Sequence, residues 1–458
     1  MELRFARALL PDGIAREVIV EVAEDGRIAG VRRGGGADGG PYRPGLALAG
    51  MPNLHSHGFQ RAMAGSAEVA TGADGSFWGW REVMYRFVGR LAPEDVAAIT
   101  AFAYLEMLES GYTAVAEFHY LHHDVDGRPY ATPSALAAAV RDAARATGIR
   151  QLLLPCLYQQ GNFDRRPLGP AQRRFHHTTE SFLALVDGLV STERARERTG
   201  VALHSLRAVP PEALQAVAAA MRGRGAGRPV HIHVAEQARE VDECVAAYGR
   251  RPVEFLLEGG YLDPHWCLVH ATHVTAAELR GIATSGAVVG LCPTTEANLG
   301  DGRFPLDEFL AAGGVFGLGS DSHVSIDPRE ELRTAEYNLR LWRERRVLAA
   351  RPAAPHAGTS LWHDAVAGGA RAFGYGGAGL VAGAPADLVL IDTERAEFAG
   401  VPEAALVDAW IFAPRPGAIA ALWVGGEPLV ERGRHREREA IERDYRASLA
   451  RLTAEART

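Results

Sequence analysis

The segment "LALAGMPNLHSHGFQ", residues 46–60, joins an apolar run to two histidines that are separated by one residue. Successive side chains of a β-strand point to opposite faces, so His55 and His57 project from the same face of the strand that the apolar run predicts. Gly58 follows them and permits a tight turn. The segment therefore predicts a strand that ends in two imidazoles, which is half of a metal site. Two solvated or hydrogen-bonded histidines are the alternative.

Seven further apolar runs follow, and Ala-rich helical stretches such as residues 93–111 and 237–249 separate them. The runs are residues 112–120, 149–158, 200–206, 229–236, 265–274, 286–293 and 313–323. Eight apolar strands that alternate with helices predict an α/β fold, a TIM-like (β/α)8 barrel. An open doubly wound sheet, the alternative, would carry a Gly-rich phosphate-binding turn after an early strand, and the sequence has none.

Short alternating strands are predicted at both ends of the chain. "REVIVEVAEDGRIAGVRR" (16–33) and "GLVAGAPADLVLIDT" (379–393) share this texture. Because short strands need partners to bury their faces, we expect one composite β-sandwich from both ends rather than an independent β tail. The predicted units are residues 1–48 and 375–432 for the sandwich, 49–374 for the barrel and 433–458 for a terminal helix with a charged face.

Composition narrows the function classes. The chain has 458 residues and a net charge of −7, so it carries no basic footprint for nucleic acid. No apolar run approaches the roughly 20 residues that span a bilayer, and the start lacks a signal-peptide pattern, which predicts a cytoplasmic protein. All 49 residues counted as Lys+Arg are arginine, which excludes a Schiff-base lysine and a carbamylated lysine between two metals. The four scattered cysteines are expected to be reduced and mostly buried.

Further polar residues stand at the C-terminal ends of predicted strands, where barrel active sites lie. His233 ends the run 229–236, His270 lies in 265–274, and Asp321 lies in "GLGSDSH". A buried imidazole or carboxylate without a partner is costly, so each needs a role. Together with the histidine pair at 55 and 57, these residues predict a metal site at one end of the barrel.

The motifs "PNLHSHGFQ", "HIHVAE", "LVHATH" and "GSDSH", in this order, resemble the amidohydrolase superfamily on its mononuclear metal-dependent deaminase branch. The resemblance covers nearly the whole chain. It implies one divalent metal, Zn²⁺ with Fe²⁺ as the alternative, held by His55, His57, His233 and Asp321. It implies that His270 orients the water that the metal activates and that Glu236 shuttles protons. Asp321 could also accept the proton of that water. A helix-terminal residue favoured by the helix dipole is the alternative for Glu236.

Substrate-binding residues are expected in the loops that follow the strands. The candidates are Gln60, Arg81, Tyr120, His204 and Arg207. Two arginines favour a substrate with carboxylates, because a guanidinium binds a carboxylate through two hydrogen bonds. In a chain so rich in arginine, a solvated surface group is the alternative for each.

The segments "HSHGFQR", "FWGWREVMY", "EFHYLHH" and "HSLRAV" resemble family members that deaminate N-formimino-L-glutamate in histidine degradation. This small substrate has two carboxylates, and the resemblance implies that the five loop residues bind its glutamate part. It also implies a homodimer. The alternatives are a ring deaminase or chlorohydrolase of the same branch, acting on guanine, adenosine or an s-triazine, and a binding scaffold without activity. The complete set of candidate metal and catalytic residues speaks against the scaffold.

The polar loop at residues 159–181 allows a lid, an oligomer contact or a solvated surface loop. His176 and His177 lie in it, and we expect both to be solvated.

Overall fold

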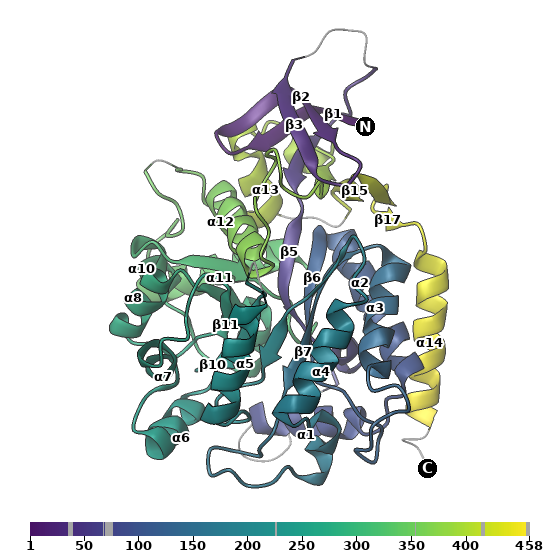
Figure 1. Cartoon of the computed structure of the whole chain (residues 1–458). Coiled ribbons are helices and arrows are strands. Elements are labelled where there is room, and N and C mark those ends of the chain that lie inside the picture. The colour runs from purple at the N-terminus through teal and green to yellow at the C-terminus, as the bar shows by residue number, and fades with distance from the viewer. Residues whose placement is uncertain are drawn as a thin grey trace.

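The computed structural model describes residues 1–34, 40–66, 68, 77–224, 227–352, 354–413 and 417–454. The side chains of residues 77–79, which open the segment "FWGWREVMY", lie outside this description. Figure 1 shows a barrel with helices around it and a smaller sheet that packs at one end of the barrel.

Within the described residues, parallel strands close into a barrel. Strand β6 pairs with β5 on one side and with β7 on the other, which completes the ring. Two short strands, β8 and β9, share one position beside β7. The strands are β5 (Met51–Ser56), β6 (Tyr112–His119), β7 (Arg150–Leu157), β8 (Glu197–Thr199), β9 (Val201–Leu203), β10 (Val230–Val234), β11 (Trp266–His270), β12 (Val288–Leu291) and β13 (Val315–Leu318). The predicted (β/α)8 barrel is confirmed.

Helices cover the outside of the barrel (Figure 1). They are α1 (Phe77–Val88), α2 (Pro93–Ser110), α3 (Ala135–Thr147), α4 (Thr179–Val190), α5 (Pro211–Gly223), α6 (Ala238–Tyr248), α7 (Pro252–Glu258), α8 (Ala276–Ser285), α9 (Pro293–Leu299), α10 (Leu306–Ala311), α11 (Pro328–Arg343) and α12 (Ala357–Ala372). Helix α13 (Leu406–Phe412) follows near the small sheet. The C-terminal helix α14 (Arg438–Ala454) packs on α2, where Tyr445 stacks on Phe102 with ring centroids 4.1 Å apart. Among the described residues, no helix is both long and apolar enough to cross a membrane.

The two ends of the chain form one β-domain, as predicted. Its strands hydrogen-bond in the order β17-β16-β15-β14-β4-β1-β2-β3, which is one sheet. They are β1 (Glu2–Leu10), β2 (Gly13–Val22), β3 (Ile28–Arg33), β4 (Leu46–Ala49), β14 (Leu388–Ile391), β15 (Ile419–Val424), β16 (Glu427–Glu431) and β17 (Arg434–His435). Phe5 of β1 meets Trp423 of β15 edge to face, with centroids 5.6 Å apart, although β4 and β14 lie between these strands. The sheet therefore curls over its own apolar face, as a sandwich does.

The apolar run at residues 46–56 is not one barrel strand, as its sequence predicts, but two strands in two domains. Residues Leu46–Ala49 pair with β14 in the small sheet, and Met51–Ser56 enter the barrel. Gly50 lies between them, and its N–H donates to the carbonyl oxygen of Asp387. A Cβ at this position would lie 2.2 Å from the side chain of Thr113, so only glycine fits where the chain passes between the domains.

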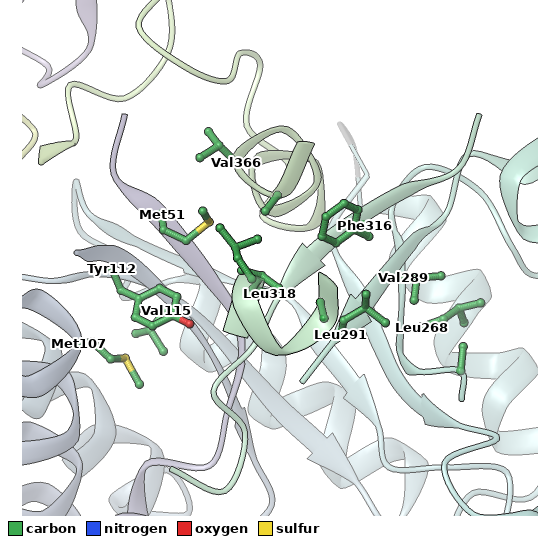
Figure 2. Packing of buried hydrophobic residues seen from close by; sticks show 14 of the residues in the cluster. Met51, Met107, Tyr112, Val115, Leu268, Val289, Leu291, Phe316, Leu318 and Val366 are labelled. Carbon is green, nitrogen blue, oxygen red and sulfur yellow. The ribbon is translucent and has the colours of Figure 1, made fainter. Parts of the chain in front are cut away.

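Buried aliphatic and aromatic side chains hold β5 at its place in the barrel (Figure 2). Met51 of β5, Leu318 of β13 and Val366 of α12 belong to one cluster of buried residues, as do Tyr112 and Val115 of β6. All five are at most 5 % exposed. This packing, worth about 1.5–3 kcal/mol for each fully buried side chain, fixes the strand that carries the histidine pair.

Candidate active site

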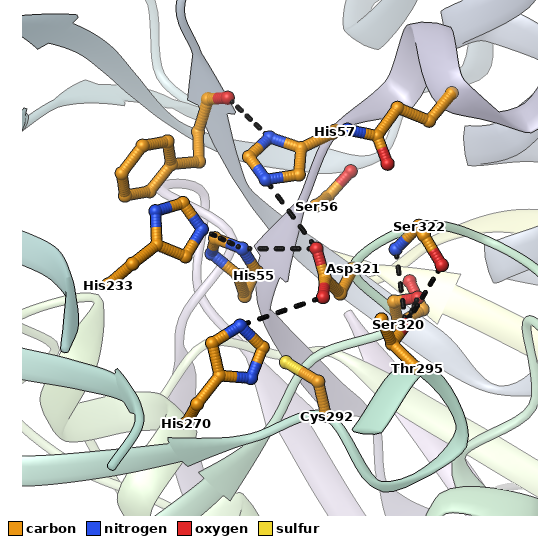
Figure 3. A network of polar contacts seen from close by, with 12 residues as sticks. His55, Ser56, His57, His233, His270, Cys292, Thr295, Ser320, Asp321 and Ser322 are labelled. Carbon is orange, nitrogen blue, oxygen red and sulfur yellow. Dashed lines mark hydrogen bonds and ion pairs between the residues drawn. The ribbon is translucent and has the colours of Figure 1, made fainter. Parts of the chain in front are cut away.

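Four predicted ligands meet at the C-terminal end of the barrel (Figure 3). His55 and His57 come from β5, His233 from β10, and Asp321 follows β13. The Nε2 atom of His55 lies 3.0 Å from Nε2 of His233 and 3.3 Å from Oδ1 of Asp321. The Nε2 atom of His57 lies 3.5 Å from the same Oδ1. Three strand ends thus converge on one point, and all four side chains are buried.

Hydrogen bonds orient two of the three imidazoles, those of His57 and His233. Nδ1–H of His57 donates to the carbonyl oxygen of Phe118 at 2.8 Å, and Nδ1–H of His233 donates to the carbonyl oxygen of His204 at 2.9 Å. The Nε2 atom of each ring therefore carries a lone pair that faces the other ligands. Burial lowers the pKa of all three histidines, to about 3 for His55, so the rings are neutral and suited to bind a cation.

Backbone strain gathers at these strand ends. Ala235, His270, Asp321 and His323 have positive φ values of 51°, 67°, 47° and 60°, a region that residues other than glycine rarely adopt. The N–H of Asp321 donates to the carbonyl oxygen of His55, and the N–H of His57 donates to that of Asp321, at 3.0 and 3.2 Å. This exchange holds Asp321 in register with the histidine pair despite the strain.

The buried carboxyl group of Glu117, which was not among the predicted site residues, supports the segment that carries His55 and His57. Glu117, near the end of β6, accepts hydrogen bonds from the N–H of Gly58 at 2.7 Å and from the hydroxyls of Ser56 and Tyr104. Burial raises the pKa of Glu117 to about 7. The side chain thus fixes the turn that follows His57. It stands in the segment "EFHYLHH", but its partners lie far away in sequence, so only the fold reveals its contacts.

His270 ends β11, and Glu236 follows β10, the strand that carries His233; both side chains lie beside the ligand cluster. Nε2 of His270 lies 3.7 Å from Oε1 of Glu236 and 3.8 Å from Oδ2 of Asp321, while its Nδ1–H donates to Glu296 at 3.2 Å. Burial alone would lower the pKa of His270, but the surrounding carboxylates outweigh it and raise the pKa to about 10. Burial raises the pKa of Glu236 to about 7, which makes its carboxyl group able to take up or release a proton near neutral pH.

Two more acidic residues, also missed from the sequence, hold the segment around Glu236. Glu240 accepts hydrogen bonds from the N–H groups of Ala235 and Glu236 at 3.1 and 3.2 Å. Asp301 accepts a hydrogen bond from the side-chain amide of Gln237. One carboxylate oxygen of Asp301 lies within 4.8 Å of a carboxylate oxygen of Glu236 and of a ring nitrogen of His270. The sequence does hold a signal for Glu240, since this residue stands four positions after Glu236, about one helical turn. Nothing in the sequence points to Asp301.

The five predicted substrate-binding residues line one cavity beside the ligand cluster, which also reaches His57, His233, Glu236, His270 and Asp321. Gln60 donates from Nε2 to the hydroxyl of Tyr120 at 2.9 Å, and its Oε1 is buried without a hydrogen-bond partner among the described residues. Arg81 donates from Nε to the hydroxyl of Tyr85 at 2.6 Å. Arg207 is buried, with 9 % of the residue exposed. The cavity therefore presents two cations within reach of the candidate metal ligands.

His204 completes the wall of the cavity. Its ring lies 4.5 Å from that of Tyr158 and 5.2 Å from that of His233, measured between centroids. Burial and then the charges of Arg207 and Arg81 lower the pKa of His204 well below its usual value. The imidazole is therefore neutral and does not oppose the arginines.

The loop at residues 159–181 also contributes to the wall. Its short helix Pro170–Phe175 places Phe175 in the cavity, and Gln172 donates to the hydroxyl of Tyr158 at 2.8 Å. The expectation that both His176 and His177 are solvated is wrong for His177. That ring is 6 % exposed, because its Nδ1 is hydrogen-bonded to Ser181 and the ring packs against His122 with centroids 4.5 Å apart.

The model of the Amidohydrolase family matches residues 46–429, which include the whole barrel and part of the β-domain. The chain belongs to the amidohydrolase family. Amidohydrolases depend on a metal ion, and His55, His57 and His233 form one of the groups in this chain whose ligand atoms lie within 4.8 Å of one another.

Individual relatives agree with this membership. The chain is 48 % identical to formimidoylglutamate deiminase of Pseudomonas aeruginosa over 440 residues, which cover 96 % of each protein. It is 31 % identical to 5-methylthioadenosine/S-adenosylhomocysteine deaminase of Natronomonas pharaonis over 390 residues, 84 % of this chain and 81 % of that protein. The crystal structure of an amidohydrolase from Brucella melitensis has a TM-score of 0.92 and 43 % identity, and the match covers 99 % of both chains.

Proposed function

We propose that this amidohydrolase is a formimidoylglutamate deiminase. It hydrolyses N-formimino-L-glutamate to N-formyl-L-glutamate and ammonia, a step of histidine degradation. The observation that carries the proposal is the cavity in which Arg81 and Arg207 stand beside a cluster of three histidines and a carboxylate. A linear amidine with two carboxylates needs both features in one cavity. The 48 % identity to the enzyme of that name from Pseudomonas aeruginosa supports it.

The proposed cofactor is one divalent cation, Zn²⁺ with Fe²⁺ as the alternative, held by His55, His57, His233 and Asp321. Three neutral imidazoles and one carboxylate are a donor set that zinc prefers. Ligand atoms around zinc at tetrahedral angles lie roughly 3.3–3.6 Å apart. The separations of 3.3 and 3.5 Å lie within that range, and the separation of 3.0 Å between His55 and His233 is shorter. A cation would also remove the conflict between two Nε2 atoms that face each other across 3.0 Å.

In the proposed mechanism, Arg81 and Arg207 each receive one carboxylate of the substrate, which places the formimino carbon over the ligand cluster. Gln60 accepts a hydrogen bond from a substrate N–H through its Oε1, the buried acceptor without a partner among the described residues. Tyr120 supports that amide from its other side. A bound divalent cation would supply Lewis acidity, which lowers the pKa of water towards about 7 and makes hydroxide available at neutral pH.

Three side chains then manage the protons. Asp321 accepts a proton from the attacking water, and His270 orients that water from its Nε2, which lies 3.8 Å from Asp321. Glu236 delivers a proton to the imino nitrogen as the carbon–oxygen bond forms, and the proton that Asp321 accepted then passes to the same nitrogen, so that the carbon–nitrogen bond breaks and ammonia leaves. The proton of the new hydroxyl returns to Glu236 as the formyl C=O forms, which restores both carboxyl groups. A carboxyl group with a pKa of about 7 is matched to this transfer.

The test is ammonia release by zinc-loaded protein from N-formimino-L-glutamate, with guanine and adenosine assayed beside it. We expect release from the formimino compound alone. Release only from a ring substrate would retain the metal site, reject the proposed substrate and leave Arg81 and Arg207 without a role in binding. No release by a protein that binds zinc would reject the enzyme altogether in favour of a binding scaffold.

We also propose an oligomeric state, a cellular location and a domain division for this protein. These are a homodimer, a cytoplasmic location, and a division into residues 1–48 and 375–432, 49–374 and 433–458. Analytical ultracentrifugation tests the dimer, and limited proteolysis tests the division.

A further inference from the structure

A second cavity lies at the opposite end of the barrel from the candidate active site. It has a volume of about 490 Å³ and is lined by residues that begin strands, such as Arg150 of β7 and Glu197 of β8, together with Arg27 of the β-domain. Ligand sites usually measure about 300–1,000 Å³. The cavity is therefore large enough for a small molecule, and it lies where the barrel meets the β-domain.

Arginines dominate the wall of this cavity. Those that line it are Arg27, Arg150, Arg196, Arg198, Arg224 and Arg228. The lining carboxylates, Glu193 and Glu197, already have partners. Glu193 accepts from Arg228 and from the N–H of Thr199, both at 2.7 Å, and Glu197 accepts from Arg145 at 2.6 Å. Arg224 in turn pairs with Asp187 at 2.7 Å, and the exposed Arg27 lies 3.8 Å from Asp25.

Two of the arginines link the domains. Arg150 forms a bidentate pair with Asp387 at 2.9 Å, and Arg196 pairs with Glu427 at 2.8 Å. Their role is structural. Their positive charges are balanced by these two carboxylates, so they need no ligand.

Arg198 differs from these two. It donates to the carbonyl oxygens of Gly374 and Gly227, at 2.6 and 3.2 Å, and has no ion pair among the described residues. Burial and then the charge of Arg228 lower the pKa of Arg198. Arg228 is compensated by its ion pair with Glu193, whereas Arg198 has only backbone carbonyl oxygens as partners among the described residues. An anion in the cavity would supply Arg198 with the charge partner that it lacks.

We propose that this cavity binds a phosphate group, either as inorganic phosphate or as part of a small phosphate monoester. Arg27, Arg198 and Arg228 reach it from three different segments of the chain. Donors from several directions match a tetrahedral dianion, whereas one planar carboxylate is matched by a single guanidinium. Gln151, a lining residue that is 1 % exposed, has its Oε1 without a partner among the described residues, and a hydroxyl of the ligand would donate to it.

The test is isothermal titration of the metal-loaded full chain at constant ionic strength. The probes are inorganic phosphate, ribose 5-phosphate, citrate and chloride, and the variants are Arg198→Met and Arg27→Met. Arg27 is exposed, so its variant keeps the test valid if Arg198→Met fails to fold. The control is Arg333→Met, because Arg333 is also half-buried and donates to a backbone carbonyl, that of Ile411, away from the cavity.

We expect one phosphate site per chain, weakened about tenfold or more in Arg198→Met, weakened in Arg27→Met and unchanged in Arg333→Met. Equal binding of inorganic phosphate and the monoester would identify free phosphate as the ligand, and binding of the monoester alone would identify a phosphorylated metabolite. The proposal would be overturned if the protein bound citrate but not phosphate. It would also be overturned if phosphate bound equally well to the wild type and to both cavity variants, or if chloride bound as strongly as phosphate.

Discussion

Glu240 provides a sharp test of how the fold aims the proposed general acid. Its carboxylate receives two backbone N–H groups, from Ala235 and from Glu236 itself, at 3.1 and 3.2 Å. Ala235 has a φ of 51°, in the left-handed region that costs roughly 1–2 kcal/mol for a residue with a Cβ. The two hydrogen bonds offset that strain and fix the backbone from which the Glu236 side chain enters the cavity.

The substitution Glu240→Gln keeps the shape of the side chain but replaces one oxygen with an NH2 group. That group faces a backbone N–H, so one hydrogen bond to a charged acceptor, worth about 1.5–3 kcal/mol, is lost. If the loss appears entirely in the barrier for proton delivery, kcat falls by about 10- to 150-fold, because about 1.4 kcal/mol corresponds to a factor of ten.

The assay is steady-state ammonia release from N-formimino-L-glutamate, with kcat and KM determined separately and the bound metal measured. The control is Glu243→Gln on the same helix, whose carboxylate pairs with Arg239 and Asn162 instead of the turn. We expect kcat to fall in Glu240→Gln alone, with the metal retained. A kcat within about twofold of the wild type, or a loss of metal or folded protein in place of a kcat effect, would refute a positioning role.

Three further predictions concern the proposed reaction. Glu236→Ala should retain the metal and lose about 10²–10⁴-fold in kcat, measured by ammonia release, and near wild-type turnover would remove its acid–base role. Arg207→Met should lower kcat/KM by about tenfold or more with the metal content unchanged, because a charge-assisted contact to a carboxylate disappears. The exposed Arg222→Met serves as its control. Dialysis against a chelator should abolish turnover and lower the melting temperature, and added Zn²⁺ should restore both; activity that survives in metal-free protein would contradict the assigned ligands.

The site residues that could be predicted from the sequence are those whose positions follow from the pattern of a single strand. His55 and His57 share a face because side chains alternate along a strand, and that rule needs no knowledge of the partners. The strand-end positions of His233, His270 and Asp321 followed from the order of apolar runs and the rule that barrel sites lie at strand ends. The same rule placed Gln60, Tyr120 and the two arginines in the loops around that end.

Residues whose role depends on distant partners were not open to prediction. Glu117 supports the turn at Gly58, which lies 59 positions earlier in the chain. Asp301 reaches Gln237 across 64 positions. A carboxylate in an alternating or helical pattern looks like a solvated side chain until the packing shows that water is excluded from it. The break of the apolar run 46–56 into two strands was also not predicted, since an apolar run does not reveal which strands it pairs with.

The sequence alone therefore determined the order of strands and helices, the barrel, the joining of the two chain ends and the kind of chemistry, because each depends on local periodicity or on a short motif. Only the tertiary structure decided which side chains share a hydrogen bond, which carboxylates are buried and which arginines gather at each end of the barrel. Those properties depend on distances between residues far apart in the chain, and the closing of the barrel sets these distances.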